Sequence, residues 1–305
     1  MCGDSTDVTY EKMFDDRFGC PRVVSINRCN GCSHSFVNPR LEQGEVGELY
    51  ETYYGRSSSV DLTPSGTVSR PGRRWILGQT NLGHFVLDPS VTTTLLDVGS
   101  GDCQNLCDAT ALGFQAVGYD VDRTTAVIGA RNGLEVRVGI SVGSAYPNQR
   151  FSAIQLNQVI EHYLDPRAQL REIRDHLDSG GRLFISTPNA GSVFRRVFRR
   201  RWINWHVPYH QHHFTKKSLR TLLESEDWDV VSLRTVTPIV WFVLQIRQVG
   251  SRPVCGQPSA SWGGPSSRLI SAMLLAFVAV MVVPLRLLDL IGFGDSLAVV
   301  ASRRQ

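Results

Sequence analysis

The stretch LLDVGSGDC, residues 95–103, decides the fold of this 305-residue chain. Its apolar half is typical of a buried strand, and Gly99 and Gly101 then permit a tight turn into a helix that begins near residue 102. Glycines at such a turn let a ligand approach the backbone, and the free N–H groups at the start of a helix attract polar ligands. The stretch therefore predicts the first strand and helix of an open α/β sheet, with a ligand site between them.

Strands and helices alternate outward from this stretch, as βαβ units on a parallel sheet do. The predicted strands are TTTLLDVG (92–99), FQAVGYDV (114–121), LEVRVG (134–139), FSAIQLNQVI (151–160), RLFISTP (182–188), WDVVSLRTV (228–236) and DSLAVVASR (295–303). The predicted helices cover residues 102–113, 123–133, 166–181 and 215–227. The segment between the last two strands is therefore an insertion into the α/β fold.

Composition limits the class of protein. A chain with 42% hydrophobic and 20% charged residues can bury a large core, and a net charge of +4 is too small to indicate nucleic-acid binding. The charge is nevertheless uneven, because no Asp or Glu occurs between Ser179 and Leu223, where arginines and lysines gather. The seven cysteines follow a polar, acidic N-terminus that does not resemble a secretory signal. These features predict a reducing cytoplasmic compartment.

Two acidic residues near the glycine turn indicate the kind of ligand. Asp102 follows Gly101 directly and would repel a pyrophosphate, and the third glycine of a dinucleotide-binding motif is missing. Asp120 ends the next strand, about twenty residues further on, where a carboxylate can accept both hydroxyls of a ribose. A nucleoside ligand is favoured over a dinucleotide, and a turn that merely connects a strand to a helix is the alternative.

The segments LLDVGSGDC, VGYDVD, FSAIQLNQVIEHYLDPRAQLREIRDHLDSGGRLFISTPN and HQHHFTKKSLRTLLESEDWDV together resemble class I S-adenosylmethionine-dependent methyltransferases. They are similar more narrowly to the branch that includes the ubiquinone-biosynthesis O-methyltransferases and many methyltransferases of cell-surface glycan gene clusters. The resemblance covers roughly residues 92–236 and the final strand. It implies a seven-stranded Rossmann-like methyltransferase sheet whose last strand is antiparallel, with the cofactor over the carboxyl ends of the first strands.

The resemblance also implies the residues that bind S-adenosylmethionine. Gly99 and Gly101 would cradle its methionine portion, Asp97 would orient that portion, and Asp120 would hold the ribose. Asn157 completes the expected cofactor-binding set. Cys103 stands where the family usually has glycine, which narrows the turn.

Candidate catalytic residues follow the fourth predicted strand in NQVIEHYLDP, residues 157–166. Glu161 and His162 are suited to acid and base work, because a histidine can take a proton from an acceptor hydroxyl. The alternative is that His162 only packs at the end of the strand. His210 is a further candidate on the acceptor side. Related quinone enzymes bind a divalent metal with an acid at the position of Gln158, so Gln158 counts against metal-assisted catalysis.

The long segment 189–214, which carries five arginines, has three interpretations. In the first, its arginines are donors to an anionic acceptor such as a phosphate. Alternatively, Trp202 and Trp205 enter a membrane interface beside Phe194 and Phe198. The third interpretation is a solvated charged surface. The histidines of this segment do not indicate zinc, because no cysteine or carboxylate is near them in the sequence.

The N-terminal segment contains Cys29 and Cys32 in a C-x-x-C knuckle, and such knuckles bind zinc in pairs. Many methyltransferases of glycan gene clusters begin with a zinc ribbon of this kind. Cys2 looks like the remnant of a second knuckle, so Cys2, Cys29 and Cys32 are the candidate metal ligands. His34 or Cys20 would supply the fourth. The alternative is a decayed site that binds no metal.

The run LISAMLLAFVAVMVVP, residues 269–284, lies in the insertion and is too short for a straight membrane span. Pro284 is expected to break the helix near its end. A second apolar block at 238–246 suggests a helical hairpin that enters one leaflet as a monotopic anchor. A true span and a core or dimer helix are the alternatives.

These segments predict an order of parts along the chain. They are a partial zinc-ribbon-like segment (1–45), a helical extension (46–91), a methyltransferase core (92–237), an apolar membrane-associated insertion (238–293), and the final strand and tail (294–305). The expected function is S-adenosylmethionine-dependent methyl transfer to an amphiphilic or anionic acceptor, either lipid-linked or a glycan, at the cytoplasmic side of a membrane, with no nucleic-acid partner. A quinone-type small-molecule O-methyltransferase and a non-catalytic cofactor-binding scaffold are the alternatives.

Overall fold

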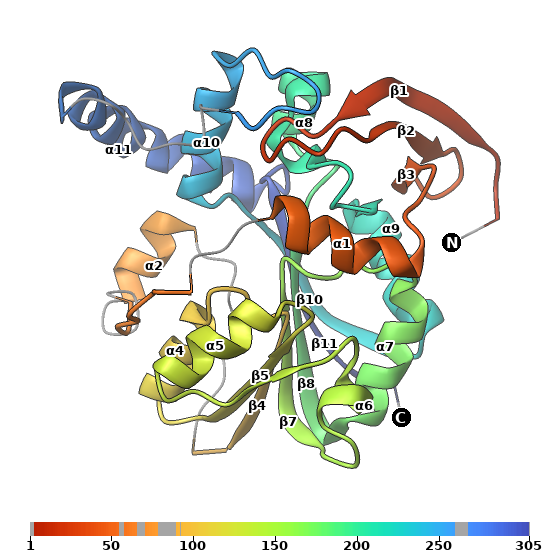
Figure 1. Ribbon diagram of the computed structural model, residues 1–305, viewed down its shortest axis with the longest axis vertical. Helices are drawn as coiled ribbons and strands as arrows, with labels where there is room; N and C mark the ends of the chain where they lie inside the picture. The colour runs from red at the N-terminus through yellow and green to blue at the C-terminus, as the bar shows by residue number, and fades with distance from the viewer. Residues whose placement is uncertain are drawn as a thin grey trace.

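A computed structural model describes residues 3–54, 58–65, 71–78, 90–91, 93–259 and 268–304. Its centre is a seven-stranded sheet with the strand order β10-β11-β8-β7-β4-β5-β6 (Figure 1). In chain order these strands are β4 (Thr94–Val98), β5 (Gln115–Asp120), β6 (Val136–Val138), β7 (Phe151–Asn157), β8 (Leu177–Pro188), β10 (Trp228–Val236) and β11 (Ser296–Arg303). Only β11 runs antiparallel to its neighbours. The predicted seven-stranded methyltransferase sheet is confirmed.

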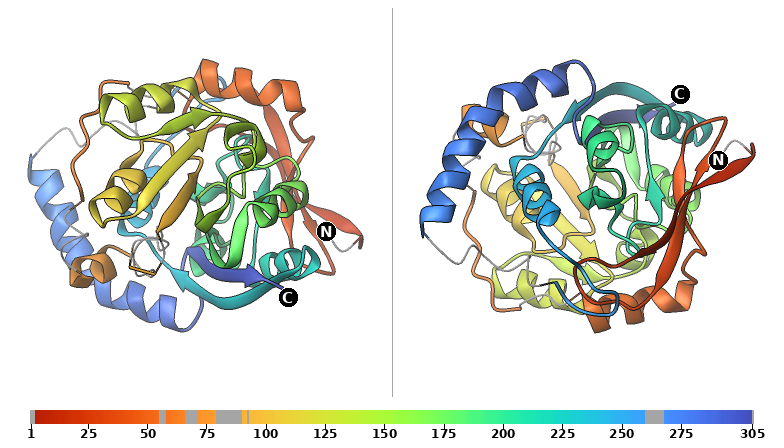
Figure 2. Two further views of the ribbon diagram at one scale, coloured as in Figure 1. Left: turned by 90° about the horizontal axis from the view of Figure 1, so that it is seen from below. Right: turned by 90° about the horizontal axis from the view of Figure 1, so that it is seen from above.

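Helices cover both faces of this sheet (Figures 1 and 2). They are α4 (Gln104–Ala111), α5 (Arg123–Arg131), α6 (Val142–Ala145), α7 (Pro166–Asp175) and α9 (Lys216–Ser225). Neighbouring strand residues point to opposite faces, so Leu95 packs with α4 whereas Leu96 joins the larger core that α7 and α9 cover. Capping fixes where these helices begin, since Asp165 accepts backbone N–H groups at the start of α7 and Thr215 does so for α9.

The N-terminal segment forms a second, antiparallel sheet with the order β1-β2-β3-β9. It comprises β1 (Thr6–Phe14), β2 (Val23–Cys29), β3 (Ser35–Asn38) and β9 (His212–His213), and α1 (Gln43–Tyr53) and α2 (Pro71–Leu77) follow it in the chain. The strand β9 belongs to the segment that leads into α9, so the small sheet joins the N-terminal segment to the core through backbone hydrogen bonds.

Segment 189–214 folds back into the protein and does not form an exposed loop. It contains α8 (Val193–Phe198) and the short 3-10 turns η1 (Arg199–Arg201) and η2 (Ile203–Trp205). Trp202 and Trp205 are buried in a cluster with Ile239, Phe242 and Leu285. The interpretation in which this tryptophan pair enters a membrane interface is therefore wrong, because the insertion covers both indole rings.

The insertion between β10 and β11 forms α10 (Ile239–Val249) and α11 (Arg268–Leu290). Pro284 was expected to break α11, but it lies inside the helix. The helix continues because the next residues bind the core: Leu285 is fully buried, and the buried Arg286 donates to the carbonyl of Thr237 and pairs with Asp289 at 3.2 Å. Within the described residues, no helix is both long enough and apolar enough to span a membrane.

Candidate functional site

The turn between β4 and α4 requires glycine at two positions. Gly99 and Gly101 adopt φ angles of +65° and +57°, in the left-handed region that side chains disfavour. A Cβ atom on Gly99 would lie 2.7 Å from the side chain of Val159. The backbone N–H groups of Gly99 and Ser100 both donate to the carbonyl of Tyr119, at 2.9 and 3.1 Å, which fixes the turn against β5.

Cys103 shows why the family usually has glycine here. It precedes α4 with a φ angle of +62°, and its side chain is fully buried. Its thiol donates to the carbonyl of Thr125 at 3.5 Å. The chain therefore tolerates a non-glycine residue in a left-handed conformation by packing the small thiol against α5.

Asp97 lies at the base of this turn and is almost completely buried. Its Oδ1 accepts a hydrogen bond from Gln155 at 3.0 Å, whereas its Oδ2 has no hydrogen-bond partner in the part of the chain that the structure describes. Burial raises the pKa of Asp97 to about 7. A buried carboxylate oxygen without a partner fits the ammonium group of the expected cofactor, because that cation would supply the missing donor.

Asp120 and Asn157 stand at the ends of the strands on either side of β4. Asp120 accepts the N–H of Gly101 through Oδ2 and the N–H of Asp122 through Oδ1, both at 2.9 Å. Asp120 therefore stabilises the glycine turn, and it also lies where the ribose of the cofactor is expected. Asn157 Oδ1 accepts a short hydrogen bond from Ser186, which ties the end of β7 to β8.

Glu161, His162 and His210 come together just beyond β7, although about fifty residues separate His210 from the other two. Glu161 is fully buried, and its Oε2 accepts from the Thr187 hydroxyl at 2.9 Å. Its Oε1 has no hydrogen-bond partner among the described residues and lies 4.0 Å from His210 Nε2. No carboxylate lies near the histidines of segment 189–214 in the sequence, but the fold brings Glu161 next to His210.

Hydrogen bonds set the orientation of both imidazole rings. His210 Nδ1 lies 2.9 Å from the carbonyl of Asn204, so Nδ1 must donate and Nε2 keeps its lone pair. His162 Nδ1 lies 2.8 Å from the Tyr50 hydroxyl and 3.1 Å from the carbonyl of Tyr209. The two rings meet edge to face with centroids 4.6 Å apart. His210 is therefore arranged to accept a proton at Nε2.

Burial determines the charge of these groups. It raises the pKa of Glu161 to about 8 and, together with the neighbouring His162 and His213, holds the pKa of His210 well below its usual range. Near neutral pH, His210 is therefore an uncharged base beside a carboxyl group that ionises at slightly higher pH.

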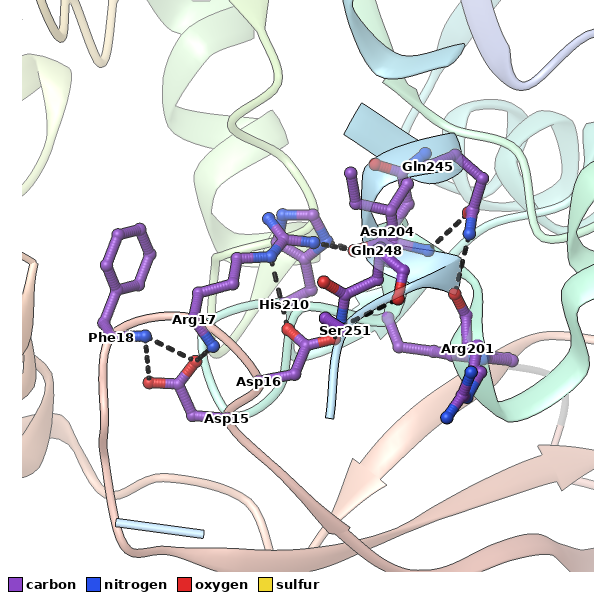
Figure 3. Close-up of polar contacts among 12 residues, drawn as sticks. Asp15, Asp16, Arg17, Phe18, Arg201, Asn204, His210, Gln245, Gln248 and Ser251 are labelled. Atoms are coloured by element: carbon purple, nitrogen blue, oxygen red, sulfur yellow. Dashed lines mark hydrogen bonds and ion pairs between the residues drawn. The ribbon is translucent and has the colours of Figure 1, made fainter. Parts of the chain in front are cut away.

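Arg17 and Tyr50 are site residues that sequence reasoning missed. The buried Arg17 donates to the carbonyl of Ile203 and pairs with Asp16 at 3.3 Å, and Figure 3 shows it beside His210. Its positive charge also contributes to the low pKa of His210, after burial and the neighbouring histidines. The sequence carries no signal for this contact, because Arg17 lies in the N-terminal segment and meets His210 only through folding.

Two glutamines of α10 hold in place the segment that precedes His210 and the N-terminal segment that carries Arg17. Gln245 accepts from the N–H of Ile203 at 2.8 Å and donates to the carbonyl of Arg201 at 2.9 Å, and Gln248 donates to Asp16 at 2.5 Å (Figure 3). The apolar insertion thus supports the segment that carries His210.

The atoms that Glu161, His162 and His210 offer as metal ligands all lie within 4.8 Å of one another, a spacing that suits a metal ion. Gln158 does not add a carboxylate to it, and its amide donates to Ser186 at 3.2 Å. One carboxylate and two imidazoles therefore suit either proton transfer or a divalent metal.

The predicted zinc ligands are only partly described. Cys29 and Cys32 are both buried at the hairpin between β2 and β3, and Cys2 lies outside the described residues. His34, a candidate fourth ligand, has its Nε2 2.9 Å from His212 Nδ1. The other candidate, Cys20, is buried beside Asp15, to which its backbone N–H donates at 3.0 Å. Zinc binding stays a prediction.

Comparison with known proteins identifies the fold family. The family model for "Methyltransferase domain" matches residues 75–233, more than half of the chain. No curated protein matches the chain.

Several solved structures are similar to the chain at low identity. A methyltransferase in complex with the Haloferax volcanii Trm112 activator has 14% identity and a TM-score of 0.47 over 78% of this chain and 96% of the other. An S-adenosylmethionine-dependent methyltransferase from Archaeoglobus fulgidus has 16% identity and a TM-score of 0.45 over 76% and 97%. An O-methyltransferase of a Brevibacillus brevis polyketide synthase, bound to S-adenosyl-L-homocysteine, has 12% identity and a TM-score of 0.45 over 78% and 77%.

Proposed function

Because this chain belongs to the methyltransferase domain family and is an S-adenosylmethionine-dependent methyltransferase, we propose that it methylates a hydroxyl group of a lipid-linked or glycan acceptor at a membrane surface. The proposed surface is the cytoplasmic side of that membrane. The observation that carries the membrane part of this proposal is the exposed apolar face of α11.

Two faces of α11 have opposite surroundings. Leu285 is fully buried against α10 and the tryptophan pair, and Leu288 packs partly against the same cluster. The other face carries an apolar stripe of residues that are each more than half exposed, made of Val280, Val283, Leu287 and Leu290 and extended by Ile291 just after the helix. Their spacing of three and four residues places them along one side of the helix. A contiguous exposed apolar stripe of this kind supports docking into the interfacial region of a bilayer.

The proposed chemistry needs a bound cofactor and a base. S-adenosylmethionine supplies a methyl group on a sulfonium ion, which an acceptor oxygen attacks in line. Gly99, Gly101 and Asp97 would hold its methionine portion, and Asp120 and Asn157 would hold the rest. We assign His210 Nε2 as the base that takes the proton of the acceptor hydroxyl, since Nδ1 already donates to Asn204.

Glu161 would stabilise the product of that proton transfer. As His210 becomes an imidazolium, a carboxylate 4.0 Å from Nε2 offsets the buried positive charge. His162, held by Tyr50 and the carbonyl of Tyr209, would form the adjoining wall of the acceptor site and serve as the second candidate base. Arg17 behind His210 would oppose the imidazolium, which makes the ionised Glu161 more important.

The test is transfer of labelled methyl groups from S-adenosylmethionine by the purified protein, with host membranes and host cytosol as separate acceptors. We expect label in membrane lipid as a methyl ether, which resists the mild base that cleaves a methyl ester. Label confined to a soluble small molecule would favour a quinone-like or other small-molecule acceptor pocket without membrane docking. Absence of label from both fractions, with S-adenosylhomocysteine still bound, would favour a non-catalytic scaffold.

A further inference from the structure

A pocket of about 440 Å³ lies outside the Glu161–His162–His210 group, between the N-terminal sheet, the start of α9 and the end of α11. Five cationic residues line it: Arg28, Arg195, Arg196, Lys216 and Lys217. No Asp or Glu is among the residues that line it. The elements come from four distant parts of the sequence, so the cluster is a product of the fold.

The positive charge of this basic pocket is not balanced by the protein. Within the described residues, none of the five cations forms an ion pair with a carboxylate. Lys217 donates to the carbonyl of Gly31 at 2.8 Å, and the guanidinium groups of Arg195 and Arg196 lie over the rings of Trp205 and Phe293. These neighbours position the cations without neutralising them.

Arg195 carries a positive charge that its neighbours in the pocket do not compensate. Its Nε is buried and lacks an acceptor among the described residues. Burial lowers the pKa of Arg195, and the positive charges of Arg28 and Arg196 lower it further. An anion in the basic pocket would relieve the repulsion among the three guanidinium groups.

Two further features favour an anion of phosphate type. Lys216 and Lys217 form the first turn of the ten-residue helix α9, whose N-terminal dipole adds positive potential. Gly292 lets the ammonium group of Lys216 lie close to the chain, because a Cβ atom there would lie 2.4 Å from Lys216 Nζ. Arginine and lysine at one site are the usual partners of phosphate oxygens.

The position of the basic pocket suggests how such a ligand would be carried. Gly292 and Phe293 line it and follow directly after Ile291, where the exposed apolar stripe of α11 ends. An anionic group held there would have an attached apolar chain beside the stripe.

We propose that the basic pocket binds a phosphate or diphosphate group, carried either by a lipid headgroup or by a free phosphorylated ligand. Binding there does not require methyl transfer, so it is measured separately from the activity proposed above.

The first arm of the test is isothermal titration of the full chain with inorganic pyrophosphate and with phosphate, at constant ionic strength set by sodium chloride. We expect binding by the wild type and a loss of about tenfold or more in affinity for the double variant Arg195→Gln/Lys216→Gln, since each charge-assisted hydrogen bond is lost. Arg234→Gln is the matched control, because Arg234 is exposed on β10 outside the pocket and forms no ion pair with another described residue. Unchanged affinity for S-adenosylhomocysteine would show that each variant is folded.

The second arm distinguishes the two sources of phosphate. The same proteins are sedimented with vesicles of phosphatidylcholine, with and without phosphatidylglycerol. Stronger retention on the anionic vesicles that the double variant loses indicates a lipid headgroup, whereas pyrophosphate binding without that difference indicates a free ligand. The proposal is overturned if the double variant and the wild type behave alike in both arms.

Discussion

At the scale of single residues, Asp97 and Glu161 share an unusual feature. Each is a buried carboxyl group with one oxygen that accepts a hydrogen bond and one oxygen without a partner among the described residues. Leaving a buried polar atom unpaired costs about 1–3 kcal/mol, so either residue in a purely structural role would destabilise the fold without compensation. We infer that a ligand or a proton completes both groups during the reaction.

Replacing Asp97 by Asn is expected to weaken binding of S-adenosylhomocysteine by about tenfold to a hundredfold, the value of a hydrogen bond between charged groups. The difference from the wild type should grow as the pH rises through about 7, because Asp97 ionises there and Asn does not. Isothermal titration at several pH values measures both effects. Asp175→Asn is the control, since Asp175 is an exposed carboxylate at the end of α7, outside the glycine turn. Equal affinities for Asp97→Asn and the wild type at high pH would refute the role.

The proposed partnership of Glu161 with His210 predicts a pH profile. Burial places the pKa of Glu161 at about 8, so the carboxylate that stabilises the imidazolium forms only as the pH rises through that value. The kcat/KM of the wild type should therefore increase with pH around 8, and Glu161→Gln should abolish the increase. His210→Asn should lower the rate by about 10²–10⁴-fold, as loss of a general base does. His176→Asn, on α7's end away from the site, should leave the rate unchanged.

Metal removal separates the two chemistries that Glu161, His162 and His210 allow. In the proposed mechanism a proton moves to His210 and no metal takes part, so EDTA should not reduce the rate of methyl transfer. A loss of activity that added divalent metal restores would instead make these three residues metal ligands.

At the scale of elements, α11 offers a comparison within one helix. Leu285→Ala should lower the free energy of unfolding by about 2–5 kcal/mol, because it opens a cavity beside the tryptophan pair. Leu287→Ala should change it by about 0.5 kcal/mol or less, since Leu287 is more than half exposed. Urea unfolding measures both variants. A large effect of Leu287→Ala would mean that the outer face of α11 is packed and not available to a membrane.

The same elements show what the sequence could and could not predict. The seven core strands followed from their apolar periodicity and bounding glycines, because local pattern fixes a βαβ sheet. The helix predicted over 166–181 was too long, since it ends at Asp175 and Leu177 already begins β8. For segment 189–214 the sequence left three interpretations open: donors to an anionic acceptor, entry into a membrane interface, or a solvated charged surface. None of them predicted that Trp202 and Trp205 pack with α10 and α11, which are distant in sequence. Arg17 and Tyr50 were missed for the same reason, since nothing near them in the chain marks their contacts with the histidines.

At the scale of the whole molecule, buried ionisable groups set the dependence of stability on pH. Burial raises the pKa of five carboxyl groups, which are Asp97 (to about 7), Glu161 (to about 8), Asp295 (to about 6), Asp16 and Asp289. The first three have the large shifts. Burial lowers the pKa of five histidines: His34, His206, His210, His212 and His213. The raised pKa values of the carboxyl groups stabilise the folded state at low pH, and the lowered pKa values of the histidines stabilise it at high pH.

The free energy of unfolding should therefore be greatest near pH 6.5. Below that value five histidines of the unfolded chain take up protons that the folded protein does not bind. They outnumber the three strongly shifted carboxyl groups, which hold protons only in the folded protein, so the net stability falls toward acid. Above pH 6.5, the folded protein still holds protons on Asp97 and Glu161 that the unfolded chain has lost. The free energy of unfolding therefore also declines from pH 6.5 to about pH 8. Urea unfolding across this range checks the curve, and a continuous rise from pH 6.5 to 8 would contradict it.

The central claim is methyl transfer to an acceptor held at a membrane surface. It is tested most directly by the rate of labelled methyl transfer to host lipid, presented in intact vesicles and dispersed in detergent, with the wild type and Leu287→Asn/Leu290→Asn. Both residues lie on the exposed stripe, away from the proposed catalytic groups. The account predicts that the double variant is at least about tenfold slower on vesicles, a loss of about 1.4 kcal/mol, and equally fast in detergent. Equal rates for the two proteins on vesicles would contradict it.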